Sequence, residues 1–335
     1  MTPPVIAFFN NKGGVGKTSL VYHLAWMYAD LGKRVVAVDF DSQSNLTAAF
    51  LDEDRLEYLW ADGVNRGTIF GCVQPLMRGT GDVADPILEG IEHRLALLVG
   101  DLRLSAFEDQ LSEVWPKCMD RDERAFRVTS AFWRVMQRAA DIQQADLILM
   151  DLGPNLGAIN RAALVATDYV VVPLSPDLFS MMGVHNLGPT LRRWRQDWQE
   201  RLQKNPVPDL ALPAGRMQPV GYVVLQHSVR MYRPVQAYER WIDRIRVVYR
   251  DDVMDGGNSG GNVATPDPSC LALLKHYHSL MPLAQEARKP IFHLKAADGA
   301  IGAHYQAARD AYFDFRRLAL KIAQCASVEM PGLPG

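Results

Sequence analysis

The segment NNKGGVGKTS at residues 10–19 contains the residue types that bind a nucleotide phosphate. Its three glycines would let main-chain N–H groups turn inward around phosphate oxygens, where side chains would obstruct them. Lys17 would place a positive charge on the β- and γ-phosphates, and the Thr18 hydroxyl would reach Mg²⁺. We therefore predict a phosphate-binding loop made of Gly13, Gly14, Val15, Gly16, Lys17, Thr18 and Ser19.

The elements expected around this loop are those that a phosphate site requires. VIAFFN (5–10) is apolar and β-prone, which predicts a buried strand before the loop. After the loop, apolar residues recur at helical spacing as far as Leu31, and Gly32 predicts the end of that helix. RVVAVDF (34–40) predicts a second buried strand. The loop would therefore join a strand to a helix N-terminus inside a βαβ unit, where phosphates bind.

The loop departs from the common pattern GxxxxGKT at one position, because Asn11 stands where the first glycine is expected. With its leading Lys12, the run KGGVGKT resembles the deviant phosphate loop of the ParA/MinD family of ATPases. VDFDSQSNLT (38–47) resembles switch I of that family, and LILMDLGPN (147–155) resembles its Walker B strand and switch II. The resemblance covers most of the chain, and its most specific motifs lie in the N-terminal third.

This resemblance implies a fold, an activity and a dimer. The fold would be that of an α/β P-loop NTPase, with a mostly parallel, twisted central sheet flanked by helices on both faces. The activity would be slow, partner-stimulated hydrolysis of ATP to ADP and phosphate, with ATP and Mg²⁺ as cofactors. In the family, two subunits enclose two ATP molecules, and the first lysine of the loop reaches the partner's phosphates as an arginine finger does. Lys12 would act in this way here; the alternative is a solvated loop lysine.

The resemblance also implies roles for three aspartates that end apolar runs. Asp41 would orient the attacking water and Asp39 would hold Mg²⁺ through water. Asp151 would bind the Mg²⁺ shell together with Thr18. The alternative for Asp39 or Asp151 alone is a turn residue at a strand end. Four residues depart from the usual switch patterns and bear on the kinetics of the switches more than on nucleotide binding: Ser42, Ser44, Leu152 and Gly153.

The composition limits the functions open to the whole molecule. The chain has 335 residues, 48% apolar and 22% charged, which is typical of a globular protein with a large core. Its formal net charge is −2, so any affinity for DNA or an anionic membrane must come from a local patch. The four cysteines form no CxxC pair, which argues against zinc, iron–sulfur and disulfide frameworks. With no signal peptide or transmembrane run, we expect a cytoplasmic protein that associates with the nucleoid when ATP is bound.

We predict a single ATPase domain over residues 1–335, with a less regular region in its first half. Between about 52 and 130 the pattern loosens. Within it, 115–127 looks like an extra charged connection, which we interpret as solvated surface in preference to a partner-binding feature. A helix over 125–144 is expected to lead into the Walker B strand.

The C-terminal half bears on the matrix that the protein would hold. The range 251–268 is rich in Gly, Asn and Pro and predicts a mobile loop, whereas 287–315 resembles the last strand and helix of ParA-type members. A MinD-like membrane mode needs an amphipathic helix at the C-terminal end. The chain finishes CASVEMPGLPG, without a basic face, so we expect no stable membrane association.

Basic clusters in the same half suit the phosphates of non-specific double-stranded DNA, which ParA-type members hold. Charged helix faces are usually only solvated, so each cluster is weak evidence alone, although dimerisation would double any real patch. The DNA-binding candidates are Arg192, Arg193, Arg195, Arg240, Arg244 and Arg246, with a further basic set on the last helix at Arg309, Arg316, Arg317 and Lys321.

The leading interpretation is a ParA-like ATPase that segregates or positions a plasmid, a chromosome or other cargo with a ParB-like or adaptor protein. One alternative is an ATP-dependent dimerising regulator of a partner complex, and another is a MinD-like membrane-associated positioning ATPase. A third is a metabolic enzyme or metal-cluster carrier on the same fold. This third alternative would need paired cysteines at a dimer axis or a dedicated substrate pocket.

Overall fold

The computed structural model describes residues 2–61, 67–225, 235–254 and 267–330. Within these residues the strands are β1 (Val5–Phe8), β2 (Val35–Asp39), β3 (Glu89–Glu92), β4 (Leu95–Leu98), β5 (Leu147–Asp151), β6 (Tyr169–Leu174), β7 (Gln218–Leu225) and β8 (Cys270–Leu274). These eight strands form one sheet in the order β3-β4-β2-β5-β1-β6-β7-β8. Neighbouring strands run parallel, except that β3 lies antiparallel to β4.

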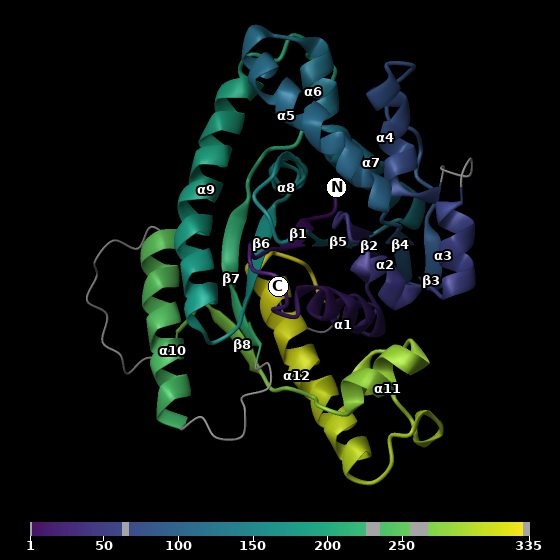
Figure 1. Cartoon of the computed structure of the whole chain (residues 1–335), viewed down its shortest axis with the longest axis vertical. Helices are drawn as coiled ribbons and strands as arrows, with labels where there is room; N and C mark the ends of the chain where they lie inside the picture. The colour runs from purple at the N-terminus through teal and green to yellow at the C-terminus, as the bar shows by residue number, and fades with distance from the viewer. Residues whose placement is uncertain (1, 62–66, 226–234, 255–266, 331–335) are drawn as a thin grey trace.

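Helices lie on both sides of this sheet, and the long α9 packs beside α10 at its margin (Figure 1). The helices are α1 (Lys17–Asp30), α2 (Asn45–Phe50), α3 (Glu53–Trp60), α4 (Ile69–Arg78), α5 (Glu108–Lys117), α6 (Glu123–Thr129), α7 (Ala131–Gln143), α8 (Ala158–Val165), α9 (Leu178–Leu202), α10 (Val235–Val248), α11 (Leu280–Ala287) and α12 (Ala303–Cys325). Among the described residues, none of them combines the length and apolar character that crossing a membrane demands.

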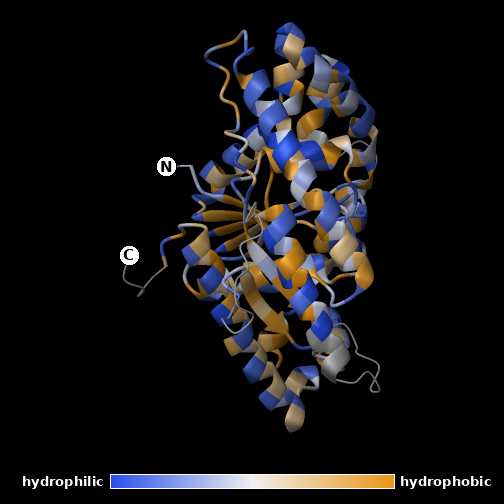
Figure 2. Ribbon diagram, turned by 90° about the vertical axis from the view of Figure 1, so that its left-hand side faces the viewer, coloured by the Kyte–Doolittle hydropathy of each residue, from blue (hydrophilic) through white to orange (hydrophobic). Residues whose placement is uncertain are grey.

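Alternate residues of the central strands serve two separate hydrophobic clusters. Val5 and Ala7 of β1 belong to a cluster completed by α4, α5, α7, α8 and α9. Ile6 and Phe8 belong to a second cluster, on the other face, completed by α1, α11 and α12. Because both faces are buried, the strands read as continuous apolar runs, and they are coloured as hydrophobic in Figure 2. The predicted mostly parallel sheet with helices on both faces is confirmed.

The carboxyl ends of three neighbouring strands meet at one edge of the sheet. Phe8 of β1 pairs with Asp151 of β5, and Asp151 pairs in turn with Asp39 of β2. The loop from β1 to α1 leaves the sheet at this same edge, as ligand-binding loops of open α/β sheets do. The topology therefore brings the glycine loop and the strand-end aspartates together.

The region between about 52 and 130 is more ordered than its sequence pattern predicts. Its strands β3 and β4 belong to the main sheet. In the segment 115–127, Cys118 and Phe126 are fully buried, so the interpretation as solvated surface is wrong for these side chains. The single-domain assignment stays a prediction.

The helix expected over 125–144 is interrupted at Ser130, which separates α6 from α7. The Ser130 hydroxyl donates a hydrogen bond of 2.7 Å to the carbonyl of Phe126. The Arg134 guanidinium donates another, also 2.7 Å, to the carbonyl of Arg127. Side chains thus bind carbonyls of α6 around the break, in addition to the main-chain bond from the N–H of Ser130 to Phe126, and hydrophobic periodicity does not report such contacts.

The C-terminal part also differs from expectation. The predicted strand in 287–315 is wrong, because Ile291–His293 is a short 3₁₀ turn and the last described strand is β8. The predicted helix is confirmed as α12. Most of the range 251–268, predicted as a mobile loop, lies outside the described residues.

Candidate nucleotide site

The loop between β1 and α1 lines a cavity of about 690 Å³. All the residues predicted for the loop line it: Gly13, Gly14, Val15, Gly16, Lys17, Thr18 and Ser19. Gly14 and Gly16 have positive φ angles of 72° and 84°, a conformation that residues with side chains rarely adopt. Because Gly16 directly precedes α1, the free N–H groups of the first helical turn are available to an anion in the cavity.

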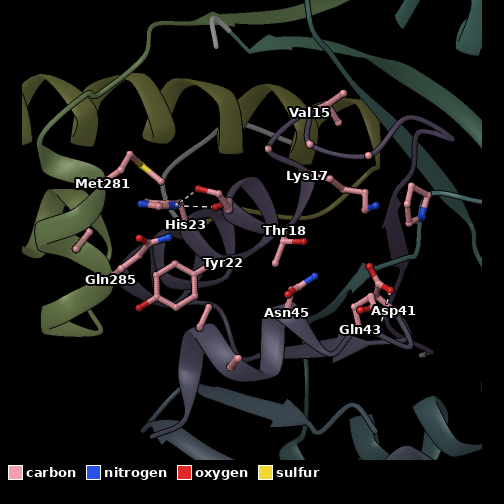
Figure 3. Close-up of a pocket in the computed structure, with 18 of the residues that line it drawn as sticks. Val15, Lys17, Thr18, Tyr22, His23, Asp41, Gln43, Asn45, Met281 and Gln285 are labelled. Atoms are coloured by element: carbon pink, nitrogen blue, oxygen red, sulfur yellow. Dashed lines mark hydrogen bonds between the residues drawn. The ribbon is translucent and has the colours of Figure 1, made fainter. Parts of the chain in front are cut away.

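The cavity lies between two groups of side chains (Figure 3). Lys17 and Asp41 lie at one end, Met281 and Gln285 of α11 lie at the other, and Thr18 lies between them. Lys17 is only 6% exposed, so its ammonium group is held within the loop. A triphosphate bound by the loop would meet this charge at the end where Asp41 lies.

Asp151 has the properties of a carboxylate that helps to hold a divalent cation. It is fully buried, and its Oδ2 accepts a hydrogen bond of 2.6 Å from Thr18 Oγ1. Its Oδ1 is also buried and accepts no hydrogen bond from the part of the chain that the structure describes. Burial raises the pKa of this carboxyl, and the charge of Lys17 opposes the rise. An orphaned carboxylate oxygen beside a threonine hydroxyl and a phosphate loop fits Mg²⁺, which prefers oxygen ligands.

Asp39 is also fully buried, and its contacts hold the segment 38–47. Its Oδ2 accepts hydrogen bonds of 2.8 Å from both the main-chain N–H and the hydroxyl of Thr47. Its Oδ1 accepts one of 3.2 Å from the N–H of Asp41. Burial and the neighbouring charge of Asp151 raise the pKa of Asp39. Within the described chain, neither Asp39 nor Asp151 is among the residues that line the cavity, so a contact of either carboxylate with Mg²⁺, through water in the case of Asp39, stays a prediction.

We expect Gly100→Ala to lower the free energy of unfolding in urea by about 1–3 kcal/mol. A Cβ at Gly100 would lie 2.9 Å from both Asp39 Oδ2 and Ser44 Oγ. Asp39 cannot move aside without losing its bonds to Thr47, which also accepts a 2.8 Å hydrogen bond from the N–H of Gly100. Gly90→Ala is the matched control, because a Cβ there would meet no described atom within 4 Å. Equal effects of the two substitutions would contradict the prediction.

Asp41 connects the two segments that resemble switches. Its Oδ1 accepts a hydrogen bond of 3.0 Å from the N–H of Gln43. A Cβ at Gly153 would lie 3.3 Å from the same oxygen, so the glycine leaves room for Asp41 to approach the chain after β5.

Lys12 lies at the margin of the cavity and is already paired within its own subunit. Its Nζ forms an ion pair with Asp177 Oδ2, at 2.5 Å, just before α9. It also lies 5.9 Å from the ring centroid of Phe179. The side chain of Lys12 is 27% exposed, far more than that of Lys17. The two lysines of the loop thus occupy different environments, one enclosed and one at the surface.

Comparison with known proteins assigns the chain to a protein family. A family model described as an AAA domain matches residues 4–204, which is more than half of the chain. The sporulation initiation inhibitor protein Soj of Bacillus subtilis is 29% identical over 188 residues, covering 56% of this chain and 64% of Soj. The chromosome partitioning protein ParA of Caulobacter vibrioides is 26% identical over 199 residues, covering 59% of this chain and 66% of that protein. The chain belongs to the ParA/MinD-type P-loop ATPases.

This chain spans just under two thirds of the length of these two curated relatives. Among solved structures, a McdA–ATP complex from Cyanothece has a TM-score of 0.63 at 12% identity, with 99% of each chain covered. At that identity the likeness shows the fold alone.

Several cavity residues of this ParA/MinD-type ATPase escaped the sequence prediction. His23 is 2% exposed; its Nδ1 donates to the Ser19 carbonyl at 2.7 Å, and its Nε2 accepts from the N–H of Ile291 at 3.2 Å. Burial lowers the pKa of His23 to about 4, so the ring is neutral. Helical spacing from Ser19 could have identified Tyr22 and His23. No local signal indicates the residues from the C-terminal half that complete the wall: Met281, Ala284, Gln285, Arg288 and Lys289.

The arginines proposed to contact DNA fall into two groups, those that bind main-chain carbonyls of the protein and those that are exposed or, in one case, half-buried. Arg192 donates a hydrogen bond to the carbonyl of Asp252. Arg195 donates to the carbonyls of Arg216 and Met217, at 2.8 and 2.7 Å. These two side chains hold α9 against neighbouring segments, a structural role that their cluster did not predict. Among the other candidates, Arg246 is half-buried. The exposed ones are Arg193, Arg240 and Arg244.

Proposed function

We propose that this chain is a slow ATPase that binds ATP with Mg²⁺, dimerises on doing so and hydrolyses ATP to segregate or position a cargo. The matrix would be non-specific double-stranded DNA, and a ParB-like or adaptor protein would stimulate turnover. One observation carries the proposal: a buried loop lysine, a second lysine and Thr18 line one cavity, and the Thr18 hydroxyl donates a hydrogen bond to the buried Asp151. The kinship with a chromosome partitioning protein supports the cellular role.

In this proposal the triphosphate lies on the glycine loop and the nucleoside extends toward α11. His23 and Met281 line both the main cavity and a smaller, mostly apolar one of about 90 Å³. Apolar walls with a few polar groups are typical of sites that enclose a nucleobase.

The residues at the loop end suit phosphoryl transfer to water. Thr18 and Asp151 would hold Mg²⁺, which when bound would neutralise charge on the phosphate oxygens. Lys17 would bind the β- and γ-phosphates from within the loop, and Asp41 would orient the attacking water. Lys12 would reach the partner's phosphates, where it would stabilise the charge that develops during transfer.

The proposed DNA surface follows α9 and α10, which lie side by side (Figure 1). Arg193 of α9 and Arg244 of α10 are exposed. Arg244 stacks on the ring of Trp241 at 4.9 Å, which restrains its guanidinium. Contacts of this kind would bind phosphates without reading bases, and a dimer would present the surface twice.

We expect Asp41→Ala to bind ATP and accumulate as a dimer, because the orienting carboxylate is lost while Lys12, Lys17 and Thr18 remain. Size-exclusion chromatography with light scattering, with and without ATP and Mg²⁺, measures this outcome. Asp109→Ala, which removes a carboxylate from the first turn of α5, is the control and should behave as wild type.

Addition of arbitrary duplex DNA completes this experiment. Only the ATP-bound dimer should bind DNA, and binding should weaken steeply as salt rises. An ATP-bound dimer that does not bind DNA would contradict the partition role and favour an ATP-dependent regulator of a partner complex. A variant that stays monomeric with ATP would contradict the proposal as a whole.

A further inference from the structure

The ion pair between Lys12 and Asp177 joins the phosphate loop to the start of α9. The two residues are 165 positions apart in the chain, yet Lys12 Nζ lies 2.5 Å from Asp177 Oδ2. Their side chains are 27% and 30% exposed, so the pair is partly shielded from water. The loop lysine that distinguishes this family's phosphate loop is therefore bound in cis in the single subunit.

The segment around Asp177 is packed closely against the loop. A Cβ at Gly183, in the second turn of α9, would lie 2.5 Å from Asn11 Oδ1 and 3.0 Å from Asn10 Oδ1. Asn10 also donates a hydrogen bond of 2.7 Å to the carbonyl of Pro173, at the end of β6. The start of α9 thus lies close against the loop, which places the carboxylate of Asp177 within reach of Lys12.

The two oxygens of Asp177 have separate tasks. Oδ1 accepts a hydrogen bond of 2.9 Å from the N–H of Ser180 and caps the N-terminus of α9. Oδ2 accepts a hydrogen bond from the ammonium group of Lys12. Asparagine caps helices as well as aspartate does but has no charge, so the two tasks can be separated by one substitution.

We propose that Asp177 is a positioning residue that holds Lys12 in cis and opposes dimerisation until a triphosphate competes for the lysine. This inference rests on the proposed ATP-dependent dimer. For Lys12 to reach the phosphates of a second subunit, its ammonium group must leave Asp177. A triphosphate can offset that loss with the charge of its γ-phosphate, whereas a diphosphate has no γ-phosphate and offers no charge there. The pair would therefore make the dimer more selective for ATP.

The first test measures the accessibility of Lys12 without nucleotide. The wild type and Asp177→Asn are treated with an amine-acylating reagent, and the modification of Lys12 is followed by mass spectrometry. An ion pair of this exposure is worth little, so we expect acylation to rise roughly two- to fivefold in the variant. Asp85→Asn is the control, because it removes the carboxylate of another ion pair, with Arg138, and makes the same change in net charge. An unchanged rate for Lys12 in Asp177→Asn would overturn the inference.

The second test measures dimerisation with the non-hydrolysable analogue AMPPNP and Mg²⁺. Two ion pairs are released per dimer, so the dissociation constant of the Asp177→Asn dimer should fall roughly two- to twentyfold below that of the wild type. With ADP, the variant should form more dimer than the wild type. An unchanged or weaker dimer would overturn the role of Asp177. A wild type that stays monomeric with AMPPNP would instead overturn the proposed dimer, while the acylation result would still show separately whether the pair exists.

Discussion

Replacement of Lys17 by alanine is expected to abolish detectable ATP binding. Lys17 is 6% exposed and lines the cavity within the glycine loop, so its charge is available to a phosphate bound there. Its charge also opposes the effect of burial on the pKa of Asp151. Removal leaves the buried Asp39 and Asp151 carboxylates with less compensating charge, in a site that must then accept a polyanion. A charge deletion of this kind should weaken binding at least about 100-fold.

Isothermal titration calorimetry with ATP and Mg²⁺ measures this loss directly. Circular dichroism should show that the variant is folded, because the hydrophobic clusters on both faces of the sheet are untouched. Lys117→Ala is the control, since Lys117 forms only a surface ion pair with Glu113 on α5. Binding within threefold of the wild type in Lys17→Ala would contradict the assignment of the phosphate site.

Replacement of Lys12 by alanine is expected to have a different result. ATP binding by the single subunit should change only a few-fold, because Lys12 lies at the margin of the cavity and is paired with Asp177. Dimer formation with ATP, or turnover, should be lost, because each subunit would lack the charge that the other requires at its phosphates. Loss of one arginine finger reduces turnover about 10³–10⁵-fold in related phosphoryl transfer, and an effect on the order of 10²-fold or more is expected here.

Light scattering and single-turnover hydrolysis, measured beside the binding assay, test this separation. Lys117→Ala again serves as the control, because Lys117 is not among the residues that line the cavity and forms a surface ion pair with Glu113. A Lys12→Ala protein that dimerises and hydrolyses ATP normally would show that the lysine does not act across a dimer. Parallel loss of ATP binding in Lys12→Ala and Lys17→Ala would show instead that both lysines serve one subunit.

The glycine loop and its place between a strand and a helix could be predicted from the sequence because these parts are contiguous. The loop, the strand before it and the helix after it all lie within residues 5–31, so spacing and residue type report on the same site. Asp39 and Asp151 could be placed as well, because each ends a buried apolar strand and parallel strands share one carboxyl edge. The parallel sheet could be predicted from the continuous apolar runs that form these buried strands.

The errors of the sequence analysis have local causes. Hydrophobic periodicity continues across Ser130, but the hydroxyl of that residue bonds to the carbonyl of Phe126 and a new helix begins at Ala131. The run after Lys289 is apolar enough for a strand, yet Ile291–His293 forms a turn whose first N–H donates to His23. In both places the structure has a hydrogen bond that hydrophobic periodicity does not report.

The sequence by itself determined the family, the phosphate loop and the strand-end carboxylates, because these depend on neighbouring residues and on strand periodicity. Only the tertiary structure decided which distant residues complete the site. Asp177 forms an ion pair with Lys12, and α11 lines the far end of the cavity. Arg192 and Arg195 donate hydrogen bonds to main-chain carbonyls of the protein itself. Such contacts join residues that are far apart in the sequence. They depend on how the helices and loops pack on the core, and residue spacing along the chain does not report that packing.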